Sequence, residues 1–241
     1  MAFQKFFNSV EPLFQKNGKY EKFYPVFEMV ETIFYTSNTV TKAAPHARSF
    51  VDMKRIMTYV VISLIPCILW AFYNTGFQTN LALSNLNSPE LAGWRIWLLQ
   101  LFDISLNPKS IFANMAHGAL YFLPIYITTL VAGGLWEVLF ATTRGHEVNE
   151  GFLVSSMLFS LTLPATTPLW MVALGISFGV VVGKEVFGGT GKNFLNPALT
   201  GRAFLYFAYP AYMSGDSVWT PVDGISSATS LGISASEGYE S

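Results

Sequence analysis

Two kinds of side chain in this sequence could carry chemistry: a run of hydroxyls around residue 229 and a carboxylate within an apolar stretch. The hydroxyls lie in "DGISSATSLG", residues 223–232, where Thr229 stands between Ala228 and Ser230. Either this run is a loop that follows a membrane helix, or one of its hydroxyls carries a group. The rest of the sequence is needed to distinguish these two interpretations.

The carboxylate belongs to Glu137, in "VAGGLWEVLFA", residues 131–141. Carboxylates inside a membrane are costly and usually line a path for cations or protons. Alternatively, Glu137 lies near the cytoplasmic end of its helix and reaches water, because Arg144, Glu147 and Glu150 follow soon after it. Both interpretations remain open at this point.

Gly133 and Gly134 remove two side chains from the middle of the same apolar run. Small residues allow helices to pack closely; they would also leave room for a flat ligand, but the residues alone favour packing. His117 lies in an apolar run too, yet haem between helices usually takes ligands from facing helices. No second histidine lies in such a run, so we expect His117 to be packed and hydrogen bonded.

The glycine-rich stretch "GKEVFGGTGKN", residues 183–193, imitates two nucleotide-binding motifs and matches neither. A P-loop needs glycine at position 186 and serine or threonine at 193, where Val186 and Asn193 stand. A dinucleotide fingerprint that starts at Gly189 needs glycine at 194 and a preceding strand, but position 194 is Phe194. We therefore predict no nucleotide site here.

Composition indicates the medium that surrounds these residues. Hydrophobic residues make up 51% of the 241 and charged residues only 12%, whereas a soluble domain carries about a quarter charged residues. A bilayer is therefore expected. The net charge of −1 argues against nucleic-acid binding, and a single cysteine, Cys67, excludes a disulfide or a cysteine-only metal site within these residues.

The elements that position the candidate residues are therefore expected to be membrane helices, which makes this an all-α membrane protein. Several apolar segments are short or interrupted by proline and glycine, a pattern typical of proteins that build an ion or substrate site from broken helices. The expected spans, each full or partial, are 56–73, 112–141, 151–163 (short), 169–183 and 194–213 (broken). Residues 94–102 are too short to span and hold two tryptophans, so an interfacial helix is expected there.

Charge asymmetry predicts the orientation. Residues 1–55 hold eight of the 14 Lys and Arg residues, which favours a cytoplasmic N-terminus. We expect 1–55 to form a cytoplasmic arm with an amphipathic helix, 56–213 a transmembrane domain, and 214–241 a periplasmic segment. The hydroxyl run then lies outside the membrane, if every segment crosses.

Three blocks of the sequence look familiar when taken together. They are "GGLWEVLFATTRGHEVNEGFLVSSMLFSLTLP" (133–164), "GKEVFGGTGKNFLNPALTGRAFLYFAYP" (183–210) and "VDGISSATSL" (222–231). The chain resembles the B subunits of bacterial Na⁺-translocating NADH:quinone oxidoreductases from about residue 1 to its end. The D subunits of Rnf ferredoxin:NAD⁺ oxidoreductases are related and share the flavin motif, but the long N-terminal arm fits the B subunits better.

The resemblance implies a redox-driven sodium pump of six subunits in the bacterial inner membrane, in contact with lipid, which passes electrons from NADH to a quinone. It implies that this subunit carries riboflavin and an FMN that a flavin transferase attaches covalently to a threonine. In the family motif, Asp is followed by Ser or Thr and then by Gly-Ala-Thr. Asp223, Ser226, Ala228 and Thr229 match it, and Ser227 replaces the glycine.

By position, the resemblance makes Thr229 the residue that bears the FMN phosphoryl group. It also implies a role in quinone or inhibitor access for Gly133 and Gly134, and a role in sodium uptake for Glu137. Asn193 and Asn196 would lie near the riboflavin.

Members of the family have roughly ten helices in two related halves, and this chain resembles the N-terminal half of that inverted-repeat bundle. We therefore expect the chain alone not to pump. The other functions that the residues allow are half of a channel or transporter without redox chemistry, and a structural membrane scaffold.

Overall fold

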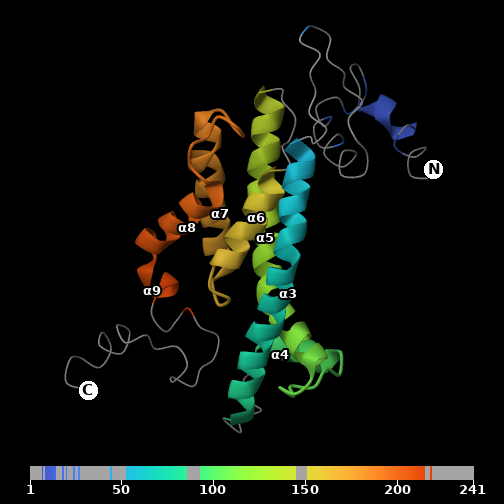
Figure 1. Ribbon diagram of the computed structural model, residues 1–241, viewed down its shortest axis with the longest axis vertical. Coiled ribbons are helices and arrows are strands. Elements are labelled where there is room, and N and C mark those ends of the chain that lie inside the picture. The colour runs from blue at the N-terminus through green and yellow to red at the C-terminus, as the bar shows by residue number, and fades with distance from the viewer. Residues whose placement is uncertain are drawn as a thin grey trace, which may run out of the picture.

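The computed structural model describes residues 53–85, 93–144 and 151–214, together with Val218 and scattered positions before residue 45. Every regular element within this part of the chain is a helix, so the expected all-α class is confirmed. The helices are α3 (Met53–Asn85), α4 (Trp94–Leu101), α5 (Ile111–Arg144), α6 (Gly151–Thr162), α7 (Leu169–Gly183), α8 (Pro197–Ala208) and α9 (Pro210–Met213), with the short 3-10 helices η1 (Glu11–Leu13) and η3 (Glu185–Phe187) (Figure 1).

Three of the described helices are long and apolar enough to cross a membrane. They cover Arg55–Ser84, Ile111–Arg144 and Leu169–Phe187. Helix α6 is apolar but has only 12 residues. At 1.5 Å per residue it is about 18 Å long, well short of the ~30 Å hydrocarbon core.

Helix α3 is longer than the apolar run that predicted it. Residues 74–85 are too polar to extend a predicted span, yet the helix continues through them to Asn85. These residues pack against the beginning of α5, where two glycines allow the backbones to meet. A Cβ on Gly76 would lie 1.8 Å from the carbonyl oxygen of Asn114, and one on Gly118 would lie 1.8 Å from that of Phe72.

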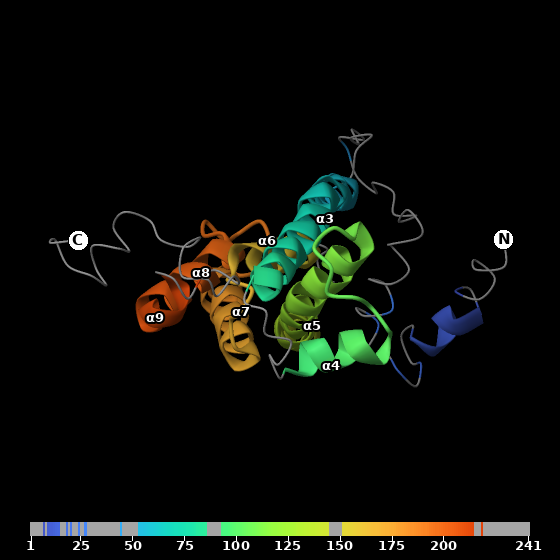
Figure 2. The same ribbon diagram turned by 90° about the horizontal axis from the view of Figure 1, so that it is seen from below.

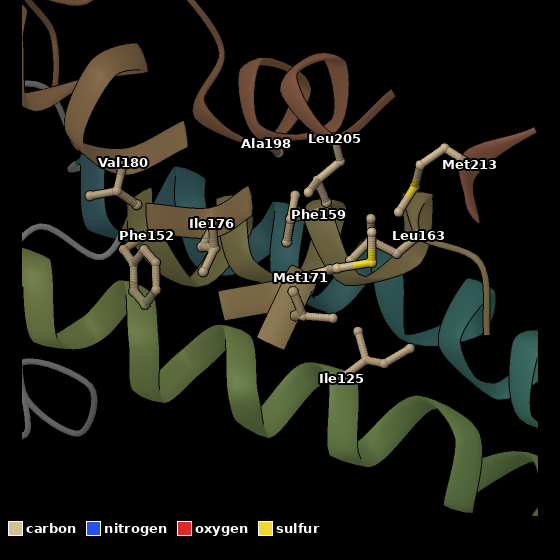
Figure 3. Close-up of a cluster of buried hydrophobic side chains, with 11 residues drawn as sticks. Ile125, Phe152, Phe159, Leu163, Met171, Ile176, Val180, Ala198, Leu205 and Met213 are labelled. Atoms are coloured by element: carbon tan, nitrogen blue, oxygen red, sulfur yellow. The ribbon is translucent and has the colours of Figure 1, made fainter. Parts of the chain in front are cut away.

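Helices α6 and α7 both pack against α5, and α8 packs against α7 and, less extensively, against α6 (Figure 1). Side chains from these four helices form one apolar cluster, with Ile125 on α5, Phe159 on α6, Ile176 on α7 and Leu205 on α8 (Figure 3). The cluster fixes how the ends of α5 and α7 lie relative to each other, and those ends carry the site described below.

The short helix α4 differs in direction from the long helices. Seen from below it appears lengthwise, so its axis lies across the bundle (Figure 2). Trp94 and Trp97 are exposed on it, while Leu99 is buried. This arrangement suits a helix in the interfacial layer of a membrane, where amphipathic tryptophan rings are favoured.

A buried charge cluster at the ends of helices α5 and α7

The Glu137 carboxylate is buried near the C-terminal end of α5. Its residue is 4% exposed, and its Oε1 accepts a hydrogen bond from the Lys184 ammonium, which lies at the C-terminal end of α7. The alternative in which Glu137 reaches water is therefore wrong. A buried charge is stable only when it is paired and hydrogen bonded, and the ion pair with Lys184 meets that need.

The ion pair continues through a second carboxylate toward the surface. Lys184 Nζ lies 3.6 Å from Glu185 Oε1. Arg144 Nη1 donates to Glu185 Oε2 at 2.8 Å, and its Nη2 donates to the Glu185 carbonyl oxygen at 2.9 Å. We call Glu137, Lys184, Glu185 and Arg144 the charge cluster.

The formal charges of the charge cluster cancel, with two carboxylates and two cations. The side chains of Glu137, Lys184 and Glu185 are 4%, 6% and 1% exposed, whereas Arg144 is 36% exposed. The cluster therefore runs from a buried carboxylate to a half-exposed guanidinium. Removing one partner of such a buried pair typically costs roughly 3–5 kcal/mol, because the other charge is left uncompensated.

The glycine-rich loop after α7 holds Lys184 and Glu185 in place. The amide of Gly188 donates to the Glu185 carbonyl at 2.9 Å, and that of Gly189 donates to the Lys184 carbonyl at 3.2 Å. Both glycines have positive φ, 108° and 92°, a conformation that side chains with a Cβ rarely adopt. Gly188 and Gly189 are therefore needed for the conformation of this turn, and not for nucleotide binding.

Gly133 lies one turn before Glu137 on the same helix, at the contact with α6 and α7. A Cβ there would be 2.5 Å from the ring of Phe152 and 3.0 Å from Ile176. At Gly134 the nearest atom, on Phe152, would be 3.8 Å away, an ordinary contact. The geometry at Gly133 favours close packing, the interpretation that its residue type suggested.

Asn193 and Asn196 both stabilise the beginning of α8. Asn193 Nδ2 donates to the Leu195 carbonyl at 2.7 Å. Asn196 is the N-cap, and its Oδ1 accepts from the amides of Ala198 and Leu199 at 2.9 and 3.3 Å. Capping of this kind satisfies amides that have no partner within the helix.

His117 is packed and hydrogen bonded, as expected from the lack of a facing histidine. Its Nδ1 lies 2.7 Å from Asn80 Oδ1, and Asn80 Nδ2 donates to Asn114 Oδ1 at 2.9 Å. Asn114 Nδ2 in turn donates to the Pro108 carbonyl at 2.8 Å. Asn80 and Asn114 were not singled out from the sequence, because a polar residue at the edge of an apolar run usually indicates a helix end.

Lys184 and Glu185 could not be connected with Glu137 from the sequence, because Glu137 is 47 residues from Lys184. The sequence signal that could have identified them is a pair of opposite charges, Lys184 and Glu185, directly after the apolar run 169–183. Asp223, Ser226, Ser227, Ala228 and Thr229 lie outside the described residues.

A model of the NQR2, RnfD and RnfE family matches residues 40–240 of the chain. The chain belongs to this family. Among curated members, the B subunit of the Na⁺-translocating NADH-quinone reductase from Chromohalobacter salexigens is 56% identical over 99% of the chain and 58% of its own length. The proteins of the same name from Ectopseudomonas mendocina and Azotobacter vinelandii are 54% and 52% identical over all of the chain and 60% of theirs.

The alignment with these family members covers the transmembrane helices and the charge cluster, since nearly the whole chain is matched. The chain spans about three fifths of the length of these relatives.

Proposed function

We propose that this chain is the N-terminal part of the membrane-embedded B subunit of a redox-driven sodium pump, which oxidises NADH and reduces quinone. Identities of 52–56% over at least 99% of the chain to proteins named for that activity support the proposal. The protein works within a six-subunit complex in the bacterial inner membrane. Sodium pumping is proposed for the assembled complex and not for this chain alone.

The observation that carries the ion-transport role is the burial of Glu137. Carboxylates at membrane depth mark cation and proton paths, and a carboxylate is a suitable oxygen ligand for a hard cation such as Na⁺. Glu137 lies at the end of the bundle where α5 and α7 finish, and the half-exposed Arg144 links the charge cluster to the surface. In this proposal Glu137 receives sodium from the cytoplasm.

The redox role rests on the segment around Thr229. The Thr229 hydroxyl bears FMN through a phosphoester that a flavin transferase forms, and the small side chains of Ser227 and Ala228 let that enzyme approach. Asp223 and Ser226 complete the recognition motif. Bound flavin supplies one-electron transfer, and the negative charge of its phosphate favours this segment lying outside the hydrocarbon.

Two further cofactor roles follow from the same family pattern. Quinone binds beside Gly133 and Gly134, where a Cβ at Gly134 would make only an ordinary contact with Phe152. Riboflavin lies near Asn193 and Asn196, at the turn before α8. Because Asn196 Oδ1 already caps α8, its amide nitrogen is the atom that would face the flavin.

Two other functions fit parts of the same structure. The matching family description includes the RnfD proteins, so an equivalent subunit of a ferredoxin:NAD⁺ oxidoreductase would share the fold. Half of a channel or transporter without redox chemistry would use the same broken helices. Covalent flavin at Thr229 separates both redox candidates from the channel.

The test is flavin attachment to the full-length protein, expressed together with its flavin transferase. We expect a band that fluoresces under ultraviolet light on a denaturing gel, and a mass increase equal to FMN minus one water. Thr229→Val should abolish both, because valine has the shape of threonine without the hydroxyl. Ser230→Ala, a matched loss of the neighbouring hydroxyl, should leave both unchanged.

A band that survives Thr229→Val would exclude Thr229 as the attachment site. A wild-type protein that shows no band and no added mass would exclude a covalent flavin on this subunit. Partial labelling of the wild type that becomes complete in Ser227→Gly would assign the deficit to the serine that replaces the motif glycine.

A further inference from the structure

The charge cluster holds one ammonium group between two carboxylates. Lys184 Nζ is hydrogen bonded to Glu137 Oε1 and lies 3.6 Å from Glu185 Oε1. A lysine side chain is flexible and its ammonium has three donors that rotate freely. A small movement of Nζ would therefore exchange one carboxylate for the other.

The charges of the cluster limit what else can bind at Glu137. Among the described residues of the cluster, Lys184 and Arg144 already balance Glu137 and Glu185. A sodium ion added beside Glu137 with Lys184 still in place would leave an extra positive charge in a buried site, which is costly. Sodium can bind at Glu137 only if the Lys184 ammonium withdraws from it.

Glu185 is placed to receive the withdrawing ammonium. Glu185 Oε2 accepts a hydrogen bond from Arg144, while Glu185 Oε1 is the oxygen that faces Lys184. The Arg144 side chain is 36% exposed, so water can solvate the guanidinium when Glu185 shares its charge with Lys184. The turn formed by Gly188 and Gly189 fixes the backbone of Lys184 and Glu185 during this change.

We propose that Lys184 is a tethered counter-cation that competes with sodium for the Glu137 carboxylate, and that Glu185 is the alternative partner to which it moves when sodium binds. The proposal rests on the role of Glu137 in the sodium path. It explains how a transport carboxylate can be buried and charged between successive ions. When sodium leaves, the ammonium returns, so Glu137 is never left charged and unpaired.

The test measures how turnover of the complete six-subunit complex, with the full-length protein in it, depends on sodium concentration. Lys184→Met removes the charge and keeps an unbranched side chain of similar length. It should lower the sodium concentration for half-maximal NADH oxidation by about fivefold or more, the lower end of typical coupling between linked ligands. Lys184→Arg keeps the charge and should show no such decrease.

Glu185→Gln should have the opposite effect, because it removes the alternative partner and leaves Lys184 on Glu137. We expect the required sodium concentration to rise by a similar factor. Calorimetric titration of sodium into the purified complex should show both shifts in affinity without relying on turnover. Lys192→Met, the same change at an exposed lysine of the neighbouring loop, should leave both measurements unchanged.

Glu137→Gln separates failure of this proposal from failure of the proposed function. If Glu137→Gln leaves the sodium dependence unchanged, Glu137 is not in the sodium path, and both its proposed role in sodium uptake and the competition with Lys184 are wrong. If Glu137→Gln raises the requirement but Lys184→Met does not lower it, Lys184 is a structural partner and the competition is wrong. If the complex with Lys184→Met does not assemble, Lys184→Gln takes its place in the same measurement. A sodium requirement that is unchanged or lower in Glu185→Gln also overturns the proposal.

Discussion

At the level of single residues, the polar groups inside the bundle are stable because partners on other helices satisfy them. The hydrogen bonds around His117 have a definite direction. The Pro108 carbonyl can only accept, so Asn114 donates to it with its amide nitrogen and accepts from Asn80 with its oxygen. Asn80 then accepts from His117, which therefore carries its proton on Nδ1.

Replacing Asn80 should destabilise the bundle more than its size suggests. Asn80→Leu keeps the branched shape and the number of side-chain heavy atoms, but it removes two hydrogen bonds and leaves Asn114 Oδ1 and His117 Nδ1 buried without that partner. We expect a loss of about 1–2 kcal/mol in the free energy of unfolding, seen as a lower thermal midpoint of the purified complex. Ser84→Ala is the control, since the Ser84 hydroxyl is exposed and bonds only within its own helix; equal midpoints for the two variants would contradict the network.

At the level of elements, the bundle depends on places where helix backbones touch. Helices α3 and α5 approach each other through Gly76 and Gly118, and α7 and α8 through Gly179, where a Cβ would lie 2.3 Å from the Pro197 carbonyl oxygen. In lipid, no hydrophobic driving force holds helices together, so the close van der Waals packing that small residues allow stabilises such crossings. The crossing of α7 and α8 positions the loop after α7, and therefore also Lys184 at the end of that helix.

Gly118→Ala tests whether the crossing of α3 and α5 is needed. The new methyl group would lie 1.8 Å from the Phe72 carbonyl oxygen, and backbone on both sides cannot yield without moving a helix. We expect a loss of at least about 1–3 kcal/mol, the usual cost of overpacking, measured as reduced yield and thermal midpoint of the complex. Gly93→Ala is the control because a Cβ there meets nothing within 4 Å. A stable, fully assembled Gly118→Ala complex would show that the helices can separate at no cost.

Hydropathy predicted most of the helices because apolar runs and proline breaks mark them directly. Helices α5, α6 and α7 cover 111–144, 151–162 and 169–183, against expected spans of 112–141, 151–163 and 169–183. The second half of α3 was missed for a physical reason. Its buried polar residue Asn80 is satisfied by α5, and such pairing across helices does not appear in a one-dimensional profile.

The candidate site was predictable only in part. Glu137 was identified because a carboxylate in an apolar run is unusual, but its partner Lys184 is 47 positions away. Their meeting depends on how α5 and α7 pack, which the composition of neither helix specifies. The segment of Thr229 was identified from the motif alone, and lies outside the described residues.

At the level of the whole molecule, more of the described Lys and Arg residues lie at the end of the bundle with the charge cluster than at the opposite end, where Arg95 on α4 and Lys109 lie. The charge cluster joins the C-terminal ends of α5 and α7, and α3 begins at the same end (Figure 1). Arg55 lies there, and Lys192 follows in the loop after α7. Lys109 lies in the loop before α5, at the opposite end of that helix. Because Lys and Arg favour the cytoplasmic side, we propose that the end with the charge cluster faces the cytoplasm.

Labelling of single cysteines in membrane vesicles tests this orientation. In the full-length protein, with Cys67 and any other cysteine replaced, Lys192→Cys should react with a membrane-impermeant maleimide only in inside-out vesicles. Lys109→Cys is the matched control, an exposed loop lysine on the other side, and should react only in right-side-out vesicles. If both positions react in the same vesicles, the bundle does not separate these loops across the membrane. If the two patterns are exchanged, the charge cluster faces the periplasm, and Glu137 would release sodium rather than take it up.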